Sequence, residues 1–293
     1  MQPPPKPILG SKDQPIRASL LPNLFKCPRF YMEKVIGDGN DIAGKDAHTG
    51  NLVHVGIQAY HQSGMKENQG KIAIEIAAKV YPLGSTDDAI RLFEKYHKRE
   101  TSERRGTVIH SEVHIEAKIP AADFDPTKEE IVIHGTVDQI RQIGRDTLYV
   151  VDHKTGRTGG ADMVLSHMPQ LAVYMLGVMD RFPDKKVEGF ITRIQDLCRI
   201  NLPYWWRMPM NGREGVLGVL KVVQHRIALL RMGIYDATPG KWCEWCPLAN
   251  YPACDTMELG FRPKPDGARI ADAIAEKLKP KGKITMDQLF GGK

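Results

Sequence analysis

The fold is decided by the stretch Ile131-Val-Ile-His-Gly-Thr-Val-Asp-Gln-Ile140, followed by Arg141-Gln-Ile-Gly-Arg-Asp146 and Thr147-Leu-Tyr-Val-Val-Asp-His-Lys-Thr-Gly156. The first and last parts are rich in β-forming residues, and a Gly-Arg-Asp turn separates them, so the stretch predicts a β-hairpin. Acidic and basic residues stand in these strands where apolar residues would be expected.

Three charged residues of this hairpin are candidates for chemistry. Because side chains alternate between the two faces of a strand, Asp152 and Lys154 should point the same way. Asp138 lies on the partner strand, and pairing of the strands would bring its carboxylate close to them. Two carboxylates and one ammonium suit a divalent metal ion that activates a water beside a phosphate. The plainer alternative is a salt bridge in a hairpin that binds no metal.

The composition is that of a soluble globular protein. The 293 residues are enough for one large domain or two small ones, and 42% of them are hydrophobic and 26% charged. No apolar run approaches the length of a membrane span, and the first residues, Met1-Gln-Pro-Pro-Pro-Lys6, lack the apolar core of a signal peptide. We therefore expect a cytoplasmic protein with no membrane partner.

The charge balance and the cysteines narrow the choice of partners. The 41 Lys and Arg residues outnumber the 35 Asp and Glu residues, giving a net charge of +6. This excess favours polyanions such as DNA, although a mildly basic cytosolic protein would also show it. Five cysteines in a non-exported chain argue against a disulfide framework, and their clustered spacing indicates a metal or cluster site.

A helix is expected upstream of the hairpin, over residues 50–61, with His54, Gln58 and His61 on one face. A single histidine in an apolar helix is more often a core residue than a ligand, so His54 alone indicates little. The next segment, 64–72, is not a nucleotide-binding P-loop. It has one intervening residue too many, and Ile72 stands where Ser or Thr must bind magnesium.

The remaining elements are expected on both sides of the hairpin. Ser85 should cap a helix that continues to His97, and residues 112–119 alternate as a strand, so a meander of at least three strands is expected. After the hairpin, Pro169 is placed near the first turn of a helix on which Gln170 and Tyr174 share a face. Two further strands (190–194 and 199–206) and a helix capped by Asn211 and ending at Gly233 follow.

Four cysteines could form one site although they lie at opposite ends of the chain. Cys243, Cys246 and Cys254 cluster near the C-terminus, and Cys27 is the distant fourth partner. Four thiolates suit either a tetrahedral zinc ion or a four-iron cluster. Cys198 is left over and is expected to be structural.

Taken together, residues from about 19 to 255 resemble the PD-(D/E)xK nuclease superfamily. Within it, they resemble the RecB-like exonucleases that carry an iron-sulfur cluster, including CRISPR spacer-acquisition nucleases and AddB-type nuclease domains. The resemblance rests on several motif positions in the family's order. They are His54 after Gly50, Asp138 in Gly-Thr-Val-Asp, the pair Asp152 and Lys154, and Gln170 with Tyr174 in a Q-x-x-x-Y helix.

The resemblance implies an α/β fold like that of restriction endonucleases, with a mixed central β-sheet flanked by helices. It implies that His54, Asp138, Asp152 and the carbonyl of His153 bind Mg²⁺ or Mn²⁺. Lys154 would orient the attacking water and stabilise charge at the phosphate, while Gln170 and Tyr174 would position the substrate or the active site.

For Cys27, Cys243, Cys246 and Cys254, the resemblance favours a [4Fe-4S] cluster over structural zinc, in a lobe formed by the N- and C-terminal segments. Seven residues separate Cys246 from Cys254, which is more than relatives commonly have, so Cys254 is the weakest assignment.

The sequence thus predicts a flexible arm (1–18), a nuclease domain with an iron-sulfur lobe (19–260) and a basic, mobile tail (261–293). The expected function is metal-dependent DNA cleavage, as an exonuclease on single strands or ends and with room for endonuclease activity. Partners are expected among replication, recombination or CRISPR-adaptation proteins. Two rivals stay open: a DNA-binding or assembly factor of such a complex that keeps the fold without cutting, and a zinc protein with an unrelated core.

Overall fold

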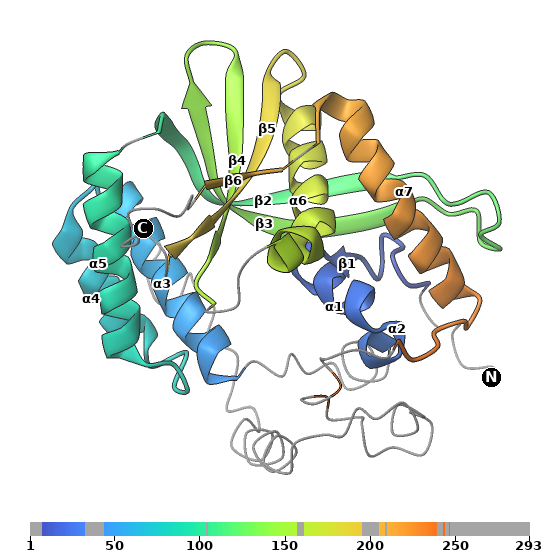
Figure 1. Ribbon diagram of the computed structural model, residues 1–293, viewed down its shortest axis with the longest axis horizontal. Helices are drawn as coiled ribbons and strands as arrows, with labels where there is room; N and C mark the ends of the chain where they lie inside the picture. The colour runs from blue at the N-terminus through green and yellow to red at the C-terminus, as the bar shows by residue number, and fades with distance from the viewer. Residues whose placement is uncertain are drawn as a thin grey trace.

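The computed structural model describes residues 8–32, 44–103, 105–156, 161–194, 205–208 and 210–238, together with Cys243 and Cys246. Within these ranges the chain forms an α/β structure with one central sheet (Figure 1). The elements, in chain order, are β1 (Ile16–Arg17), the 3-10 helix η1 (Ala18–Leu20), α1 (Leu21–Lys26), α2 (Pro28–Phe30), α3 (Lys45–Gln62), α4 (Glu67–Ala77), α5 (Thr86–Ser102), β2 (Thr107–Ile119), β3 (Ile131–Ile143), β4 (Thr147–Lys154), α6 (Ala161–Arg181), β5 (Lys186–Arg193), β6 (Trp205–Arg207) and α7 (Gly212–Arg231).

The sheet is mixed, as the sequence predicts. Its order is β1-β3-β4-β5-β6, and β2 pairs with the other edge of β3. The pairs β1·β3 and β4·β5 are parallel, whereas β2·β3, β3·β4 and β5·β6 are antiparallel. The predicted hairpin is β3 and β4, joined through Gly144, whose φ of 62° is a conformation that glycine adopts without strain. With β2 it forms the expected meander.

The two strands of the hairpin separate before either of them ends. Pairing between β3 and β4 stops at Gln139 and Val151, whereas β4 continues alongside β5 as far as Lys154 and Arg193. On the edge that β4 leaves, β3 is joined instead by β1, with Ile16 opposite Ile133. The sheet therefore divides into two arms, as Figure 1 shows, and Asp138 and Asp152 stand at the fork.

Two separate hydrophobic cores flank the fork. One packs the sheet against α1, α6 and α7 and includes Leu24, Ile133 and Leu176. The other joins α3, α4 and α5. Figure 1 shows these two groups of helices on opposite sides of the sheet. Within the described part of the chain, no helix has the length and apolar character needed to cross a membrane.

The segment rejected as a P-loop is the entry into a helix. Gly70 lies in the first turns of α4, where a Cβ would come 2.3 Å from Cζ of Phe93. On the facing helix, a Cβ at Gly56 would come 2.7 Å from Cδ1 of Ile74. These glycines therefore let α3, α4 and α5 pack closely, and they serve the helical core rather than a phosphate.

Two predictions about element boundaries are wrong in this structure. Residues 8–18 are not a flexible arm, because β1 pairs with β3 and buries Ile16; a two-residue strand leaves no periodicity to detect. Pro169 lies inside α6 rather than in its first turn, since the helix already starts at Ala161. The boundary predicted at Asn211 is confirmed, since this residue is the N-cap of α7, although its side chain makes no capping hydrogen bond.

Other local predictions are confirmed. The hydroxyl of Ser85 accepts a hydrogen bond from the N–H of Asp88 at 3.2 Å and caps α5. Outward and buried residues alternate along residues 114–119 of β2. The apolar stripe of α7 is buried, with Val216, Leu220, Val223, Ile227 and Leu230 in the core.

Candidate active site

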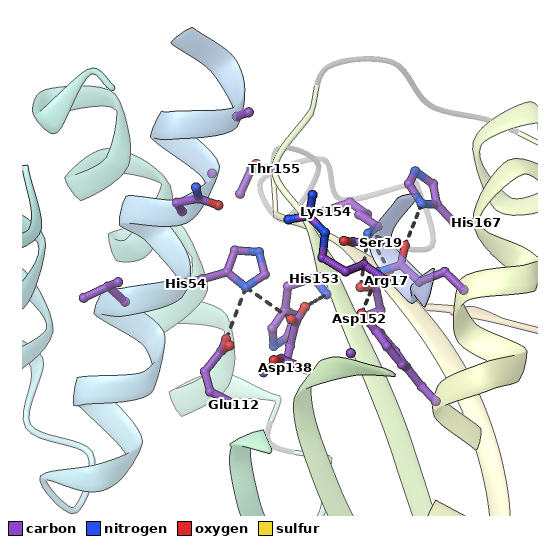
Figure 2. Close-up of a pocket in the computed structure, with 18 of the residues that line it drawn as sticks. Arg17, Ser19, His54, Glu112, Asp138, Asp152, His153, Lys154, Thr155 and His167 are labelled. Carbon is purple, nitrogen blue, oxygen red and sulfur yellow. Dashed lines mark hydrogen bonds and ion pairs between the residues drawn. The ribbon is translucent and has the colours of Figure 1, made fainter. Parts of the chain in front are cut away.

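A cavity of about 880 Å³ opens at the fork of the sheet. Its walls come from α3, β1 to β4 and α6, and it brings together the site residues that the sequence predicts from α3, the hairpin and α6 (Figure 2). Those residues are His54 from α3, Asp138 from β3, Asp152, His153 and Lys154 from β4, and Gln170 and Tyr174 from α6.

Three ligand-type side chains converge on one point of the cavity. Nδ1 of His54 lies 3.3 Å from Oδ1 of Asp138 and 3.4 Å from Oε1 of Glu112. Their ligand atoms all lie within 4.8 Å of one another, the one such group of three or more among the described residues. One imidazole nitrogen and two carboxylates fit a divalent cation such as Mn²⁺ or Mg²⁺.

Glu112 is a site residue that sequence reasoning missed, because it reads as the first residue of an alternating strand. In the structure, its φ of 52° is a left-handed conformation, which is uncommon and strained for a residue other than glycine. A register shift between Val108 and His110 lies just before it in β2. Figure 2 shows its carboxylate pointing toward His54. Because Glu112 is in phase with the polar residues His114, Glu116 and Lys118 of the same strand, the sequence carries no signal that sets it apart from an exposed strand residue.

The electrostatics of this group favour cation binding. Burial by itself would raise the pKa of Asp138, but the neighbouring His54, His153 and Lys154 lower it to about 2. Burial also raises the pKa of Glu112, although His54 opposes this effect. The pKa of His54 is lowered by burial and raised more strongly by Asp138 and Glu112, so it lies well above its ordinary value. In the absence of a metal ion, a protonated imidazole thus balances the carboxylates.

Asp138 also closes the gap between the strands. Its Oδ2 accepts a hydrogen bond from the backbone N–H of His153 at 2.5 Å. The side chain of His153 is held by Thr192, whose Oγ1 lies 2.5 Å from its Nδ1, and its ring lies 6.4 Å from that of His54 between centroids. Burial lowers the pKa of this imidazole to about 3, so it is neutral. The backbone N–H of His153 is thus tied to Asp138, and the role predicted for its carbonyl stays a prediction.

Lys154 is held by a chain of hydrogen bonds from α6. Its Nζ lies 2.8 Å from Oδ2 of Asp152 and donates to Oε1 of Gln170 at 3.2 Å. Nε2 of Gln170 in turn donates to the hydroxyl of Tyr174 at 2.9 Å. The buried Gln170 therefore has a hydrogen-bond partner at each end of its amide group. Burial raises the pKa of Asp152, and the neighbouring Lys154 opposes this effect.

A glycine on β3 makes room for Tyr174, the last residue of this series of hydrogen bonds. A Cβ at Gly135 would come 2.7 Å from Cε1 of Tyr174 and 3.0 Å from Cβ of Ala18. The aromatic ring therefore packs directly on the backbone of β3, three residues before Asp138. On the other wall, a Cβ at Gly50 would come 2.9 Å from Oγ1 of Thr155, so α3 also approaches the end of β4 closely.

Beneath the cavity floor lies a buried polar network that the sequence did not predict. Arg141 is fully buried and forms two hydrogen bonds to the carboxylate of Glu100, at 3.0 and 2.8 Å. It also donates to Gln139 and to the hydroxyl of Tyr96. The ring of Tyr96 lies edge-on to that of His153, with 5.3 Å between centroids. The network joins α5 to β3 next to the site.

The cysteine site is described only in part. Cys27 is buried between α1 and α2, Cys243 is buried, and the N–H of Cys246 donates to the carbonyl of Cys243 at 3.3 Å. These three do not form a metal-binding group within the described residues. Cys254, Cys198, Tyr204 and the tail 261–293 lie outside the described residues, as do the side chains of Trp205 and Trp206.

Comparison with known proteins identifies the family. The sequence model of the PD-(D/E)XK nuclease superfamily matches residues 18–251, which is most of the chain. No curated protein matches the sequence. Among solved structures, one named "Putative exonuclease" from Eubacterium rectale is 16% identical, with a TM-score of 0.47, and the match covers 95% of this chain and 94% of that one. SSO0001 is also 16% identical, with a TM-score of 0.35 and coverage of 70% and 85%. Both likenesses are too distant to carry an argument.

Proposed function

Because this chain belongs to the PD-(D/E)XK nuclease superfamily, we propose that it is a metal-dependent DNA nuclease that hydrolyses phosphodiester bonds. We further propose that it acts as an exonuclease on single-stranded DNA or DNA ends. The observation that carries the proposal is the convergence of the Asp152 and Lys154 pair with the group of His54, Glu112 and Asp138 in one cavity.

The residues present fit a divalent ion. His54, Glu112 and Asp138 would hold it, with Asp152 at the adjacent strand end and the carbonyl of His153 as a further oxygen ligand. An ion bound there would act as a Lewis acid on the phosphodiester and lower the pKa of a bound water. Each carboxylate sits on a strand of the sheet, and a rigid support of this kind keeps ligands in place.

Lys154 has two roles in this proposal. Its ammonium is 2.8 Å from Asp152 and faces the same cavity, so it can hold the attacking water and stabilise the negative charge that grows on the phosphate oxygens. Gln170 and Tyr174 act through it. Their hydrogen bonds fix the direction of the ammonium, which makes them positioning residues for the reaction.

The direct test is cleavage of single- and double-stranded DNA labelled at either the 5′ or the 3′ end. Cleavage with Mg²⁺ or Mn²⁺ that stops in a chelator is expected. An exonuclease releases short products from one end only, and the labelled ladder gives its polarity. Binding of DNA without cleavage in either metal would favour the rival proposal, an assembly factor that keeps the fold without cutting.

The cysteines support a second part of the proposal, namely that the protein is RecB-like and carries a [4Fe-4S] cluster on Cys27, Cys243, Cys246 and Cys254. The guanidinium of Arg29, just after Cys27, lies 5.5 Å from the ring centroid of Tyr235, which precedes Cys243. This contact brings the chain just after Cys27 next to Tyr235, eight residues before Cys243, and it supports the proposal. A brown preparation that absorbs broadly near about 400 nm is expected from thiolate-bound iron, whereas structural zinc would leave it colourless.

We also propose that the protein acts in the cytoplasm together with replication, recombination or CRISPR-adaptation proteins. This part of the proposal rests on the family resemblance alone. Copurification of tagged protein from cells treated with DNA-damaging agents would identify which of these complexes it joins.

A further inference from the structure

An exposed polar face of the sheet continues from the cation group. His114 of β2 is exposed and pairs with Thr136 of β3, which is also exposed. The rings of His114 and His134 lie 5.6 Å apart between centroids. Residues of the opposite face, such as Ile115 and Ile133, are buried in the core. The polar face therefore starts at Glu112 and Asp138 and runs away from them along β2 and β3.

Arg17 stands beside this face because β1 joins β3 where β4 leaves it. The register places Arg17 opposite His134, which lies on the same face of β3 as Asp138 and four residues before it. Arg17 is exposed and lines the same cavity as the cation group. Figure 2 shows it beside Ser19 and Lys154, on the side of the cavity opposite His54. Its guanidinium also contributes to the lowered pKa of His134, after burial and His114.

The cations of the cavity are not evenly distributed. Among its described lining residues, Arg17 and Lys154 are the two Lys or Arg side chains. The wall formed by α3 contributes instead polar or acidic groups, including Asp46, Asn51 and Gln58. A polyanionic strand leaving Lys154 therefore meets a further Lys or Arg side chain in the direction of Arg17, whereas α3 offers no Lys or Arg to the described lining and its His54 is engaged with Asp138 and Glu112.

The spacing along β3 suits an extended strand. Residues on one face of a β-strand recur about every 6.8 Å, twice the rise per residue. Asp138, Thr136 and His134 form such a series, and this interval is comparable with the separation of successive phosphates in extended single-stranded DNA. A phosphate bound by Lys154 beside Asp138 would therefore place a phosphate one or two positions further along the strand within reach of Arg17.

We propose that Arg17, assisted by the hydroxyl of Ser19 and by His134, forms a phosphate-binding subsite for single-stranded DNA, one or two nucleotides from the scissile bond. The subsite deepens the proposed nuclease function and rests on it. An arginine suits this role because its planar guanidinium can donate two parallel hydrogen bonds to phosphate oxygens. The substrate strand would then run over the exposed face of β3 toward β1.

The test is binding of end-labelled oligothymidine by fluorescence anisotropy in a chelator, so that nothing is cleaved. Arg17→Ala is compared with wild type and with Arg213→Ala, a matched change at an exposed arginine on α7 that does not line the cavity. Arg17→Ala should weaken binding roughly three- to tenfold and lower the slope of log K against log salt by about 0.7, the value for one contact on a single strand. Arg213→Ala should bind like wild type.

Oligonucleotides with one neutral methylphosphonate at successive positions locate the contact. Wild type should lose affinity when the phosphate bound by Arg17 is neutral, and Arg17→Ala should be insensitive at that position alone. Equal losses for wild type and Arg17→Ala at every position would overturn the subsite. If wild type neither binds nor cuts DNA, the proposed function itself fails. A wild type that cuts DNA while Arg17→Ala binds normally removes the subsite only.

Discussion

The carboxylate of Asp138 accepts a hydrogen bond from the backbone N–H of His153, just beyond Gln139 and Val151, the last residues at which β3 and β4 pair. Its other oxygen faces His54 at 3.3 Å. One side chain therefore does two things: it satisfies a buried backbone donor at the fork of the sheet, and it offers an oxygen to a metal ion. The same carboxylate, that of Asp138, therefore supports the separation of the two strands and supplies a ligand to the site.

Substitutions at Asp138 should separate these two roles. Asp138→Asn keeps an oxygen that can accept the hydrogen bond of His153, whereas Asp138→Ala leaves that buried N–H without a partner. Both should abolish cleavage, but Asp138→Ala should be less stable by about 1–3 kcal/mol. Urea unfolding measures the difference. Equal stability of the two variants would show that the hydrogen bond does not support the fork.

Glu112→Gln should weaken metal binding, because it removes a negative ligand beside His54 and Asp138. We expect the affinity for Mn²⁺, measured by calorimetry, to fall at least about tenfold. Glu116→Gln is the matched control, since Glu116 lies on the same strand, exposed and paired with Lys118. Unchanged Mn²⁺ affinity in Glu112→Gln would remove this residue from the metal site.

Gly135→Ala should disturb the site through Tyr174, whose ring is too close to accept a Cβ. Moving the ring displaces Gln170 and so the ammonium of Lys154, and we expect a lower kcat and a loss of roughly 1–3 kcal/mol of stability. Gly218→Ala provides the control, because a Cβ there meets nothing within 4 Å. A fully active, fully stable Gly135→Ala protein would contradict this packing.

Asp125 should make stability depend on pH away from the active site. Asp125 and Arg231 are both buried and lie 2.7 Å apart. Burial would raise the pKa of Asp125, but hydrogen bonds from Thr127 and Arg231 lower it overall. A carboxyl with a lowered pKa stabilises the fold above its unfolded pKa, and this contribution is lost as the pH falls through the folded pKa.

Asp125→Asn should accordingly cost about 3–5 kcal/mol at neutral pH, because Arg231 keeps its buried charge without the carboxylate. The difference in the free energy of unfolding between wild type and Asp125→Asn should become smaller as the pH falls below about 4, which is the ordinary pKa of an aspartate. Denaturant unfolding at several pH values measures this difference. A difference that stays constant down to pH 2 would exclude the ion pair as its cause.

Much of the fold and part of the site were predictable from the sequence. The hairpin was clear because β-branched runs flank a glycine turn, and the positions of Asp138, Asp152 and Lys154 follow from alternation. Gln170 and Tyr174 were found because a polar pair four residues apart stands out in an apolar helix. The roles of these residues, and of the four cysteines, stay predictions.

The residues that were missed depend on contacts between distant segments. Glu112 enters the cavity through a strained backbone that periodicity does not reveal. Arg141 looked like a residue of the turn, yet it is buried because Glu100 on α5 neutralises its charge. The strand β1 was assigned to a flexible arm because two residues form no pattern, and its place is fixed by the edge of β3 that β4 leaves free.

The central claim is that Lys154, held by Asp152 and Gln170, serves a metal-dependent cleavage of DNA. The most direct measurement is the single-turnover rate of end-labelled DNA cleavage in Mn²⁺ for wild type, Lys154→Ala and Lys221→Ala, an exposed lysine of α7. Lys154→Ala should lower the rate by at least roughly 10²- to 10³-fold with an unchanged circular dichroism spectrum, and Lys221→Ala should match wild type. Full activity in Lys154→Ala would contradict the account.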